Sequence, residues 1–326
     1  MPQPNAGDVH VNAILTNISI AFVQRAENFV AGQVFPIVPV QKQSDRYYTY
    51  DRSYWWRNEA KERAPSTESA GAGWVVDATP TYYCRKYALH KDIDDDTRVN
   101  ADQPIDMDRD ATTFLTQSLL IQREKLWAST FFTTGIWGQD LTGVSSGPST
   151  NQFLQWDSVN STPMDDIEAG KIIIERKTGY TPNTLVLGRA TYAQLKNHPD
   201  VLDRIKYTQR GMLTKDLLAA LFEVDRVLVP MGVENTAAEG DAAVYAFIVG
   251  DKTALLCYSA PSPGILQPSA GYTFAWTGLL GAGAFGNRIK RFRMELLSSD
   301  RVEAEIAYEQ KLVSAECGVY YATAVA

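Results

Sequence analysis

Three glycines near the end of the chain have the spacing of a cofactor-binding loop. Gly281, Gly283 and Gly286 spell GxGxxG, the fingerprint that places a dinucleotide pyrophosphate at a helix N-terminus. That chemistry requires a strand before the glycines and a helix after them. The residues that follow, NRIKRFRMEL, alternate charged and apolar types as a strand does. We therefore expect a flexible glycine turn here and no bound cofactor.

An acidic run resembles the first positions of a calcium-binding loop. Residues 92–96 read DIDDD, and carboxylates at alternate positions are the ligands that an EF-hand loop offers to Ca²⁺. Such a loop also needs glycine at its sixth position and glutamate at its twelfth, where this chain has Thr97 and Gln103. The run is interpreted as a solvated acidic turn before a long helix, without a metal.

Histidine and cysteine could support nucleophilic catalysis, but their contexts argue against it. A Ser/His/Asp triad would have to use His10, His90 or His198, and none lies near a GxSxG nucleophile motif. Cys84 and His90 are about 20 Å apart if the chain between them is a strand. The chain also has no P-loop. We expect no catalytic residue.

The three cysteines are far apart and lack the paired CxxC spacing of a zinc site. They are Cys84, Cys257 and Cys317. Their number is odd, which favours reduced, mostly buried thiols. The N-terminal MPQPNAGDVH lacks the basic and apolar regions of a signal peptide, and no apolar run is long enough to span a bilayer. We expect synthesis in the cytoplasm and no membrane partner.

Composition describes an ordinary globular chain of 326 residues, 45% hydrophobic and 21% charged. Its net charge is -7, which argues against tight nucleic-acid binding through the whole surface, because phosphate neutralisation needs clustered Lys and Arg. Loose proximity to nucleic acid is compatible with this charge.

One expected element is a feature that a compact enzyme does not need. It is the aromatic-rich segment from 46 to 93, called the aromatic excursion because it is expected to leave the body of the protein and return. It begins RYYTYDRSYWWR and returns as WVVDATPTYYCRKYALHKDI, and between 57 and 73 it lacks apolar anchors. Both limbs favour strands, so we expect a long two-stranded arm of roughly 65 Å with a polar tip. A lone hairpin is marginal in water, so the arm should lie on a neighbouring subunit. The chain should then expose well above the roughly 13,000 Å² of a compact monomer of this mass.

The candidate interface residues come from this limb and from the N-terminal segment. In the limb they are Tyr47, Tyr48, Tyr50, Trp55 and Trp56, and in a predicted amphipathic helix before residue 23 they are Ile14, Ile18 and Phe22. FVAGQVFPIVPV, residues 29–40, contains two prolines and is interpreted as an extended segment lying on a surface.

A long helix and an α/β block follow. The helix is predicted from about 104 to 134, with an apolar face of Met107, Ala111, Phe114, Leu115, Leu119 and Leu126. The block, 163–265, should contain a helix that ends at Gly179, the strand TLVLG, two helices broken at Pro199, a capped helix TKDLLAALF, the strand RVLVP, and a hairpin that turns at 250–251. The tail from 287 to 326 alternates as strands, which should pair with each other and pack on the long helix.

This order of parts resembles the major capsid proteins of tailed bacteriophages, the Hong Kong phage 97 fold family. The local wording is also similar, in VNAILTNISIAFVQ with FVAGQVFPIVPV, in TPNTLVLGRATYAQLKNHPDV, and in VYAFIVGDKTALLCYSAPSPG with GYTFAW. The resemblance covers nearly the whole chain.

The resemblance implies an α+β phage capsid fold. Residues 1–40 would be the N-terminal arm, 41–95 the E-loop, 96–162 and 266–326 the peripheral domain with the spine helix at 104–134, and 163–265 the α/β axial domain. It also implies hexamers and pentamers of this chain in an icosahedral shell of the virion, which encloses double-stranded DNA without sequence-specific binding. The chain enters the arm directly after Met1, so a scaffolding protein, like portal and decoration proteins, would be a separate partner.

Two other functions remain open at this point. One is an encapsulin-like compartment, which uses the same fold to enclose protein cargo. The other is an oligomeric enzyme with its site hidden in the α/β block. The sequence favours a structural shell protein over both.

Overall fold

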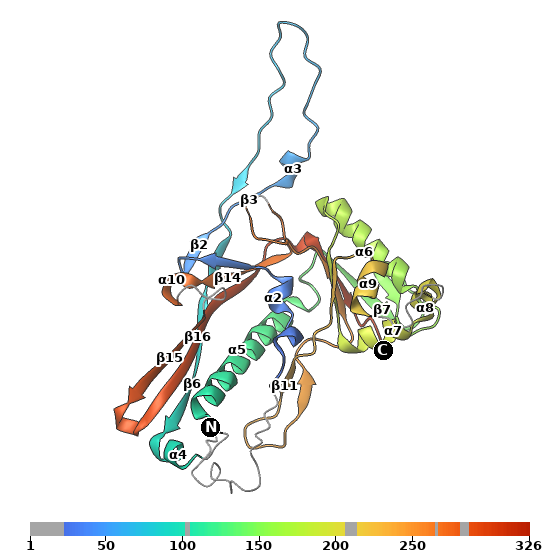
Figure 1. Ribbon diagram of the computed structural model, residues 1–326. Helices are drawn as coiled ribbons and strands as arrows, with labels where there is room; N and C mark the ends of the chain where they lie inside the picture. The colour runs from blue at the N-terminus through green and yellow to red at the C-terminus, as the bar shows by residue number, and fades with distance from the viewer. Residues whose placement is uncertain (1–22, 102–104, 206–213, 265–266, 281–286) are drawn as a thin grey trace.

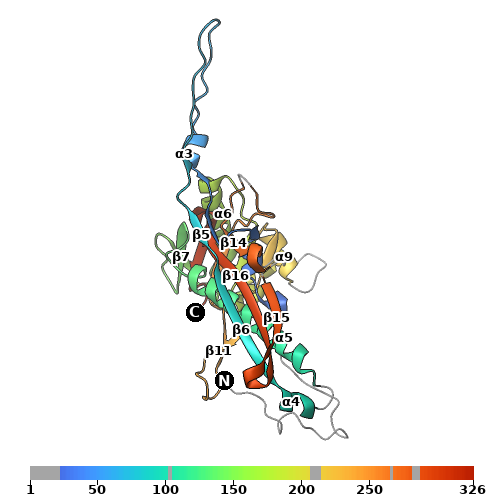
Figure 2. The same ribbon diagram turned by 90° about the vertical axis from the view of Figure 1, so that its left-hand side faces the viewer.

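The computed structural model describes residues 23–101, 105–205, 214–264, 267–280 and 287–326 (Figure 1). The body has two parts, one built on a five-stranded sheet and one on a six-stranded sheet, and a thin loop projects from it. The chain exposes 18774 Å², against about 13,000 Å² for a compact monomer of its mass. The prediction of an extended subunit is confirmed, and Figure 2 shows the loop standing clear of the body from a second side.

Helix α5 (Met107–Phe131) is the longest helix and lies along the five-stranded sheet. Asp106 caps it, because the side chain accepts a hydrogen bond from the Arg109 backbone N–H at 3.1 Å. The predicted helix is confirmed, with both ends three residues further in. Phe114 is an exception to the predicted apolar face, since it is 56% exposed. The buried stripe passes instead through Ala111 and Leu115.

The five-stranded sheet is built around β16 (Ser299–Leu312). Its other strands are β6 (Arg85–Asp94), β15 (Asn287–Met294), β14 (Gly271–Trp276) and β1 (Ile37–Val40). β16 is antiparallel to β6, β15 and β14, and β1 adds to β14 in parallel at the edge. Leu115 of α5 packs on Ile93 and Val302 of this sheet. The pairing of β15 with β16 and the packing of β16 on the long helix confirm that part of the prediction for the tail.

The six-stranded sheet has the order β10-β9-β13-β17-β7-β8. Its strands are β10 (Arg226–Leu228), β9 (Thr184–Leu187), β13 (Ala254–Cys257), β17 (Gly318–Ala322), β7 (Gln139–Val144) and β8 (Gln152–Leu154). The helices of this part are α6 (Pro163–Thr178), α7 (Arg189–Asn197), α8 (Pro199–Ile205) and α9 (Lys215–Leu221). Alternate residues of β9 and β13 face two different cores, one beneath these helices and one shared with the end of α5.

Several local predictions in this part are confirmed. α6 ends at Gly179, which has a φ of 70° in the left-handed region that glycine tolerates. α7 and α8 are separated at Pro199. α9 is capped by Thr214, whose hydroxyl accepts a hydrogen bond from the Leu217 backbone N–H.

Two pairings in this region differ from the predictions. The hairpin expected to turn at 250–251 does not form, because β12 (Tyr245–Phe247) pairs with β11 (Val233–Asn235) while β13 pairs with β9 and β17. β17, expected to pair with the other tail strands, lies in the middle of the six-stranded sheet. Both differences come from long-range pairing, which strand pattern alone does not determine.

The prediction for residues 29–40 is also wrong in part. Instead of lying extended on a surface, it begins with the buried turn α2 (Ala31–Val34), which follows the short 3-10 turn η1 (Ala26–Asn28). Phe35 is fully buried, with its ring centroid 4.8 Å from that of Phe131. Only β1 is extended, and its edge position suits Pro39. The apolar density of FVAGQVF reflects core packing.

Glu124 of α5 binds the backbone at the start of the turn α2. Its two carboxylate oxygens accept hydrogen bonds from the backbone N–H groups of Val30 and Ala31, each at 2.9 Å. The side chain is fully buried. Burial raises the pKa of Glu124, against the two N–H donors and the Arg123 guanidinium, which lower it. A carboxylate that caps a turn from another helix fixes where the N-terminal segment joins the body.

Candidate subunit interface

The projecting loop leaves the body after β1 and returns at β6. Its paired elements are β2 (Ser44–Arg46) with β5 (Thr81–Tyr83) and β3 (Thr49–Tyr50) with β4 (Val76–Asp77), with one helical turn, α3 (Arg52–Trp55), on the outgoing limb. From 56 to 75 the chain has no strand, so the prediction of a long two-stranded ladder is wrong for the outer half of the loop. That half lacks the apolar cross-strand pairs that stabilise a ladder.

The returning limb also differs from its prediction. The end of this limb, from Arg85 onward, belongs to β6, a strand of the five-stranded sheet of the body. The free part of the excursion is therefore shorter than the sequence indicates. Both views show it as a narrow projection beyond α3 (Figures 1 and 2).

The base of the loop is fixed by aromatic packing on the body. The ring of Tyr82 stacks on that of Phe274 with centroids 4.6 Å apart, and Tyr47 lies 5.6 Å from the same ring. Cys84 is fully buried beside them, and burial raises the pKa of its thiol to about 12. Tyr47, predicted as an interface residue, thus packs on its own subunit.

Further out, three aromatic rings join the two limbs. Trp55 lies 5.6 Å from Tyr50 and 6.0 Å from Trp74, between ring centroids. In the isolated chain these three side chains are 40% to 64% exposed, and Tyr48 is 70% exposed. Exposed aromatic rings held in place by one another offer large contact area at low entropic cost. Trp56 is also exposed, but one edge of its ring faces Gly179 at the end of α6.

Sequence reasoning did not select Trp74 as an interface residue. Trp74 is 64% exposed, and Val75 and Val76 beside it are 51% and 41% exposed. The run WVV at the start of the returning limb was the available signal. The structure brings it together with Trp55, whereas Ile14, Ile18 and Phe22 lie outside the described residues.

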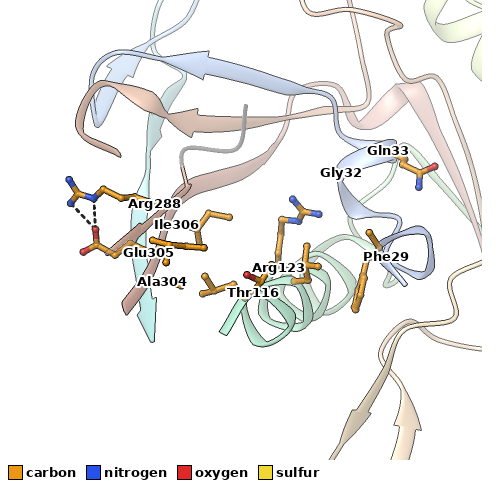
Figure 3. Close-up of a pocket in the computed structure, with 13 residues that line it drawn as sticks. Phe29, Gly32, Gln33, Thr116, Arg123, Arg288, Ala304, Glu305 and Ile306 are labelled. Atoms are coloured by element: carbon orange, nitrogen blue, oxygen red, sulfur yellow. Dashed lines mark hydrogen bonds and ion pairs between the residues drawn. The ribbon is translucent and has the colours of Figure 1, made fainter. Parts of the chain in front are cut away.

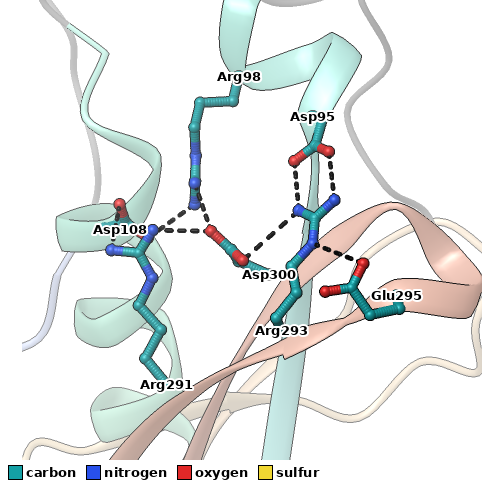
Figure 4. A network of polar contacts seen from close by, with 7 residues as sticks. All are labelled: Asp95, Arg98, Asp108, Arg291, Arg293, Glu295 and Asp300. Atoms are coloured by element: carbon teal, nitrogen blue, oxygen red, sulfur yellow. Dashed lines mark hydrogen bonds and ion pairs between the residues drawn. The ribbon is translucent and has the colours of Figure 1, made fainter.

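Two further exposed apolar side chains lie at the end of the five-stranded sheet where β6 ends and β15 turns into β16. Leu296, on the turn η2 (Glu295–Leu297), is 99% exposed, and Val99, on α4 (Asp95–Asn100), is 84% exposed. Both elements are held by a network of arginines and carboxylates (Figure 4). Asp300 accepts hydrogen bonds from Arg291 and Arg98, which lower its pKa to about 2.

This network corrects the interpretation of the acidic run. Asp95 accepts hydrogen bonds from both terminal nitrogens of Arg293, each at 2.6 Å. Asp92 accepts hydrogen bonds from Nε and Nη2 of Arg301, at 2.6 and 2.8 Å. The acidic run is therefore not a turn, because it spans the end of β6 and the start of α4 (Asp95–Asn100). Asp92 and Asp95 bind arginines of β16 and β15, while Asp94 and Asp96 are exposed. Among the described residues no three or more His, Cys, Asp or Glu side chains gather as a metal site would require.

One cavity of about 320 Å³ lies between η1, α2, α5 and the strands β15 and β16 (Figure 3). Its wall includes Phe29, Leu119 and Ile306. Glu305 at its edge is 1% exposed and is bound by Arg288 at 2.7 Å. The cavity is lined mainly by apolar side chains, without a nucleophile beside a base among the residues that line it.

The structure describes one of the candidate catalytic histidines in a buried, hydrogen-bonded position. His198 is buried; its Nε2 lies 2.9 Å from Ser161 Oγ, and its Nδ1 accepts a hydrogen bond from the Asp200 backbone N–H. Both ring nitrogens thus serve local structure. His10 and the GxGxxG glycines lie outside the described residues. In the part of the chain that the structure describes, no helix has the length and apolar character to cross a membrane.

Solved structures define the class of fold. A phage-related protein from Bordetella bronchiseptica RB50 aligns with a TM-score of 0.67 at 21% identity over 92% of this chain and 94% of that one. The capsid of cyanophage P-SCSP1u aligns at 0.59 with 11% identity, over 98% and 95%. The SrpI encapsulin of Synechococcus elongatus PCC 7942 aligns at 0.55 with 10% identity, over 97% of this chain and 94% of that one. The chain has the phage capsid fold, and the predicted fold class is confirmed.

Two relatives found by sequence are both phage major capsid proteins. The major capsid protein of Burkholderia phage BcepMu is 26% identical over 230 residues, 67% of this chain and 68% of that protein. The major capsid protein of Pseudomonas phage JBD67 is 24% identical over 319 residues, 96% of each chain. No family model matches the sequence. The resemblance to phage major capsid proteins found in the sequence is confirmed by these relatives.

Proposed function

We propose that this chain is the major capsid protein of a tailed bacteriophage and assembles as hexamers and pentamers into an icosahedral shell around double-stranded DNA. The observation that carries the proposal is a phage capsid fold whose loop presents exposed aromatic rings beyond its own body. The named relatives support the same assignment. The protein would belong to the virion.

The parts of the chain take the roles that the fold implies. Residues 1–40 act as the N-terminal arm, and the loop within 41–95 acts as the E-loop. The five-stranded sheet and the spine helix α5 form the peripheral part, and the six-stranded sheet with its helices forms the axial part. β17 at the C-terminus belongs with the axial sheet, so each part is completed by a distant segment of the chain.

The mechanism is geometric and requires no chemistry. Tyr48, Trp55 and Trp74 contact an adjacent subunit, and burial of their exposed surface favours association. A closed shell joins many such contacts, so modest pairwise energies give a stable particle. DNA is enclosed without sequence-specific binding, in keeping with the net charge of -7. We assign the chain no enzymatic activity, and scaffolding, portal and decoration proteins would be separate partners.

An encapsulin-like compartment is the second candidate. The alignment to the SrpI encapsulin over 97% of this chain favours it, because an encapsulin complex has the same fold. The two candidates differ in what the shell contains.

Electron microscopy of the purified, recombinant chain tests the first step of the proposal. Closed shells of uniform diameter are the expected result, whereas small discrete oligomers would support an oligomeric enzyme and contradict a shell. Particles produced during phage growth separate the two shell functions, because nuclease-protected DNA is expected for a virion and a protein cargo without DNA for a compartment.

A further inference from the structure

Arg52 attaches the projecting loop to the body at a second point, away from the aromatic base. It is the first residue of α3 and its guanidinium reaches the end of α6. Nη1 donates a hydrogen bond to the carbonyl oxygen of Lys177 at 2.6 Å, a group in the last helical turn that has no partner within its own helix. Nη2 forms an ion pair with the carboxylate of Glu316, on the short turn η3 (Ala315–Cys317).

Trp56 completes this contact from the loop side. The Arg52 guanidinium lies over the Trp56 ring, 5.7 Å from its centroid. The same ring approaches Gly179, where a β-carbon would lie 3.6 Å from the indole. Arg52 and Trp56 therefore clamp α3 onto the C-terminal end of α6.

This clamp involves residues that are far apart in the chain. Arg52 is 125 positions from Lys177 and contacts α6 and η3, which both belong to the axial part. The aromatic base, by contrast, rests on Phe274 in the five-stranded sheet. The loop is thus attached to both parts of the body.

Two attachments matter because the rest of the loop is weakly fixed. Between the base and α3 the strand pairing of the two limbs is limited to the two residue pairs of β3 with β4, and Tyr48 there is 70% exposed. Short ladders of this kind are marginal in water. Beyond α3 the chain from 57 to 73 is exposed, except for the half-buried Glu59, and Arg63 bonds only to the nearby carbonyl oxygen of Thr67. The orientation of α3 therefore sets the direction of the tip.

We propose that Arg52 is the positioning residue of the loop, which fixes the angle at which the aromatic rings meet a neighbouring copy of this chain. The proposal rests on the proposed function for its partner. Arginine suits this position because its planar fork donates to a carbonyl and a carboxylate at once while its face lies on an indole. A lysine could satisfy only part of that arrangement.

A distance measurement within one subunit tests this role without requiring assembly. Nitroxide labels are placed at Ser53→Cys on α3 and Gln194→Cys on α7, both exposed. The native Cys84 and Cys257 are buried, with thiol pKa values raised to about 12, so they react slowly. Pulsed dipolar spectroscopy on labelled chains diluted with unlabelled chains gives the distribution of distances between the labels.

A narrow distribution is expected for the chain with Arg52, and at least a doubling of its width for Arg52→Ala. Arg52→Lys should lie between them. Arg57→Ala is the matched control, because the Arg57 guanidinium lies over Tyr54 and pairs with Glu59, both within the loop. It should leave the width unchanged.

Salt provides a test that needs no substitution. The Arg52 and Glu316 side chains are 41% and 37% exposed, so 1 M NaCl should screen the pair and broaden the distribution of the unsubstituted chain. A distribution as narrow in Arg52→Ala as in the unsubstituted chain would overturn the proposal whatever the assembly result. If the unsubstituted chain forms no shells, the proposed function fails while the label distances still decide the role of Arg52.

Discussion

Trp74 gives the sharpest test of the loop as an intersubunit contact. Its side chain is 64% exposed and touches Trp55 across the loop. Taking about 200 Å² for a whole tryptophan side chain, roughly 130 Å² is available to a neighbour. At about 25 cal/mol per Å², covering that surface is worth about 3 kcal/mol for each contact. Trp74→Ala should therefore weaken each subunit contact about 100-fold, since about 1.4 kcal/mol corresponds to a factor of ten.

The assay is the critical concentration for shell formation, measured by sedimentation at matched amounts of soluble protein. It should rise steeply for Trp74→Ala, while thermal unfolding of the free subunit should change little, because the ring does not pack on the body. Lys61→Ala is the matched control in the same loop and should have little effect, because Lys61 is exposed and exposed charges contribute little. A critical concentration equal to that of the unsubstituted chain would refute the argument that this ring is covered by a neighbour.

Four further outcomes follow from the structure. Deletion of 57–73 should leave a soluble subunit that assembles poorly, and normal particle yield on sedimentation would contradict this. Glu124→Ala should lower the free energy of unfolding by about 2–4 kcal/mol, because two buried N–H groups lose their acceptor, and Glu124→Gln by less, as denaturant titration would measure. Cys84→Ala and Cys257→Ala should still form shells, and thiol reagents at pH 8 should react with these cysteines only after unfolding, since burial raises both pKa values to about 12. The pKa of Asp300 is lowered to about 2, so its stabilising ion pairs are complete above the ordinary pKa of about 3.9 and are lost as pH falls through about 2. The protection of the backbone amides around Asp300 against hydrogen exchange, relative to an unfolded chain at the same pH, should therefore be constant from pH 7 to 4, and Asp300→Asn should reduce it at pH 7.

Elements with local signals could be predicted from the sequence. α5 and α9 begin at capping side chains, α6 ends at a left-handed glycine, and a proline separates α7 from α8. These signals act within a turn or two of the chain, so they survive whatever the rest of the fold does. The same holds for the alternation that identified β15 and β16.

Strand partners and core contacts between distant parts of the chain could not be predicted in the same way. The sequence of β17 fits either sheet, and only the packing of Val319 and Tyr321 in the core beneath α6 places it in the larger one. The burial of Phe35 depends on rings of α5 nearly a hundred positions away. Strand pattern gives the face that is apolar but not the partner that covers it.

The candidate interface was likewise predictable only where its signal is local. Aromatic content identified the loop, yet Tyr47 packs on its own body, whereas Trp74 is exposed in the returning limb. Which ring faces outward depends on Phe274, far along the chain. The clamp at Arg52 depends on α6 and η3 and has no signature in its local sequence.

A reconstruction of the assembled particle by electron cryomicroscopy tests the central claim most directly. We predict a closed icosahedral shell in which the loop of each subunit lies across an adjacent copy, with Trp55 and Trp74 covered at that contact. A shell in which these rings face solvent, or a loop folded back on its own subunit, would contradict the account.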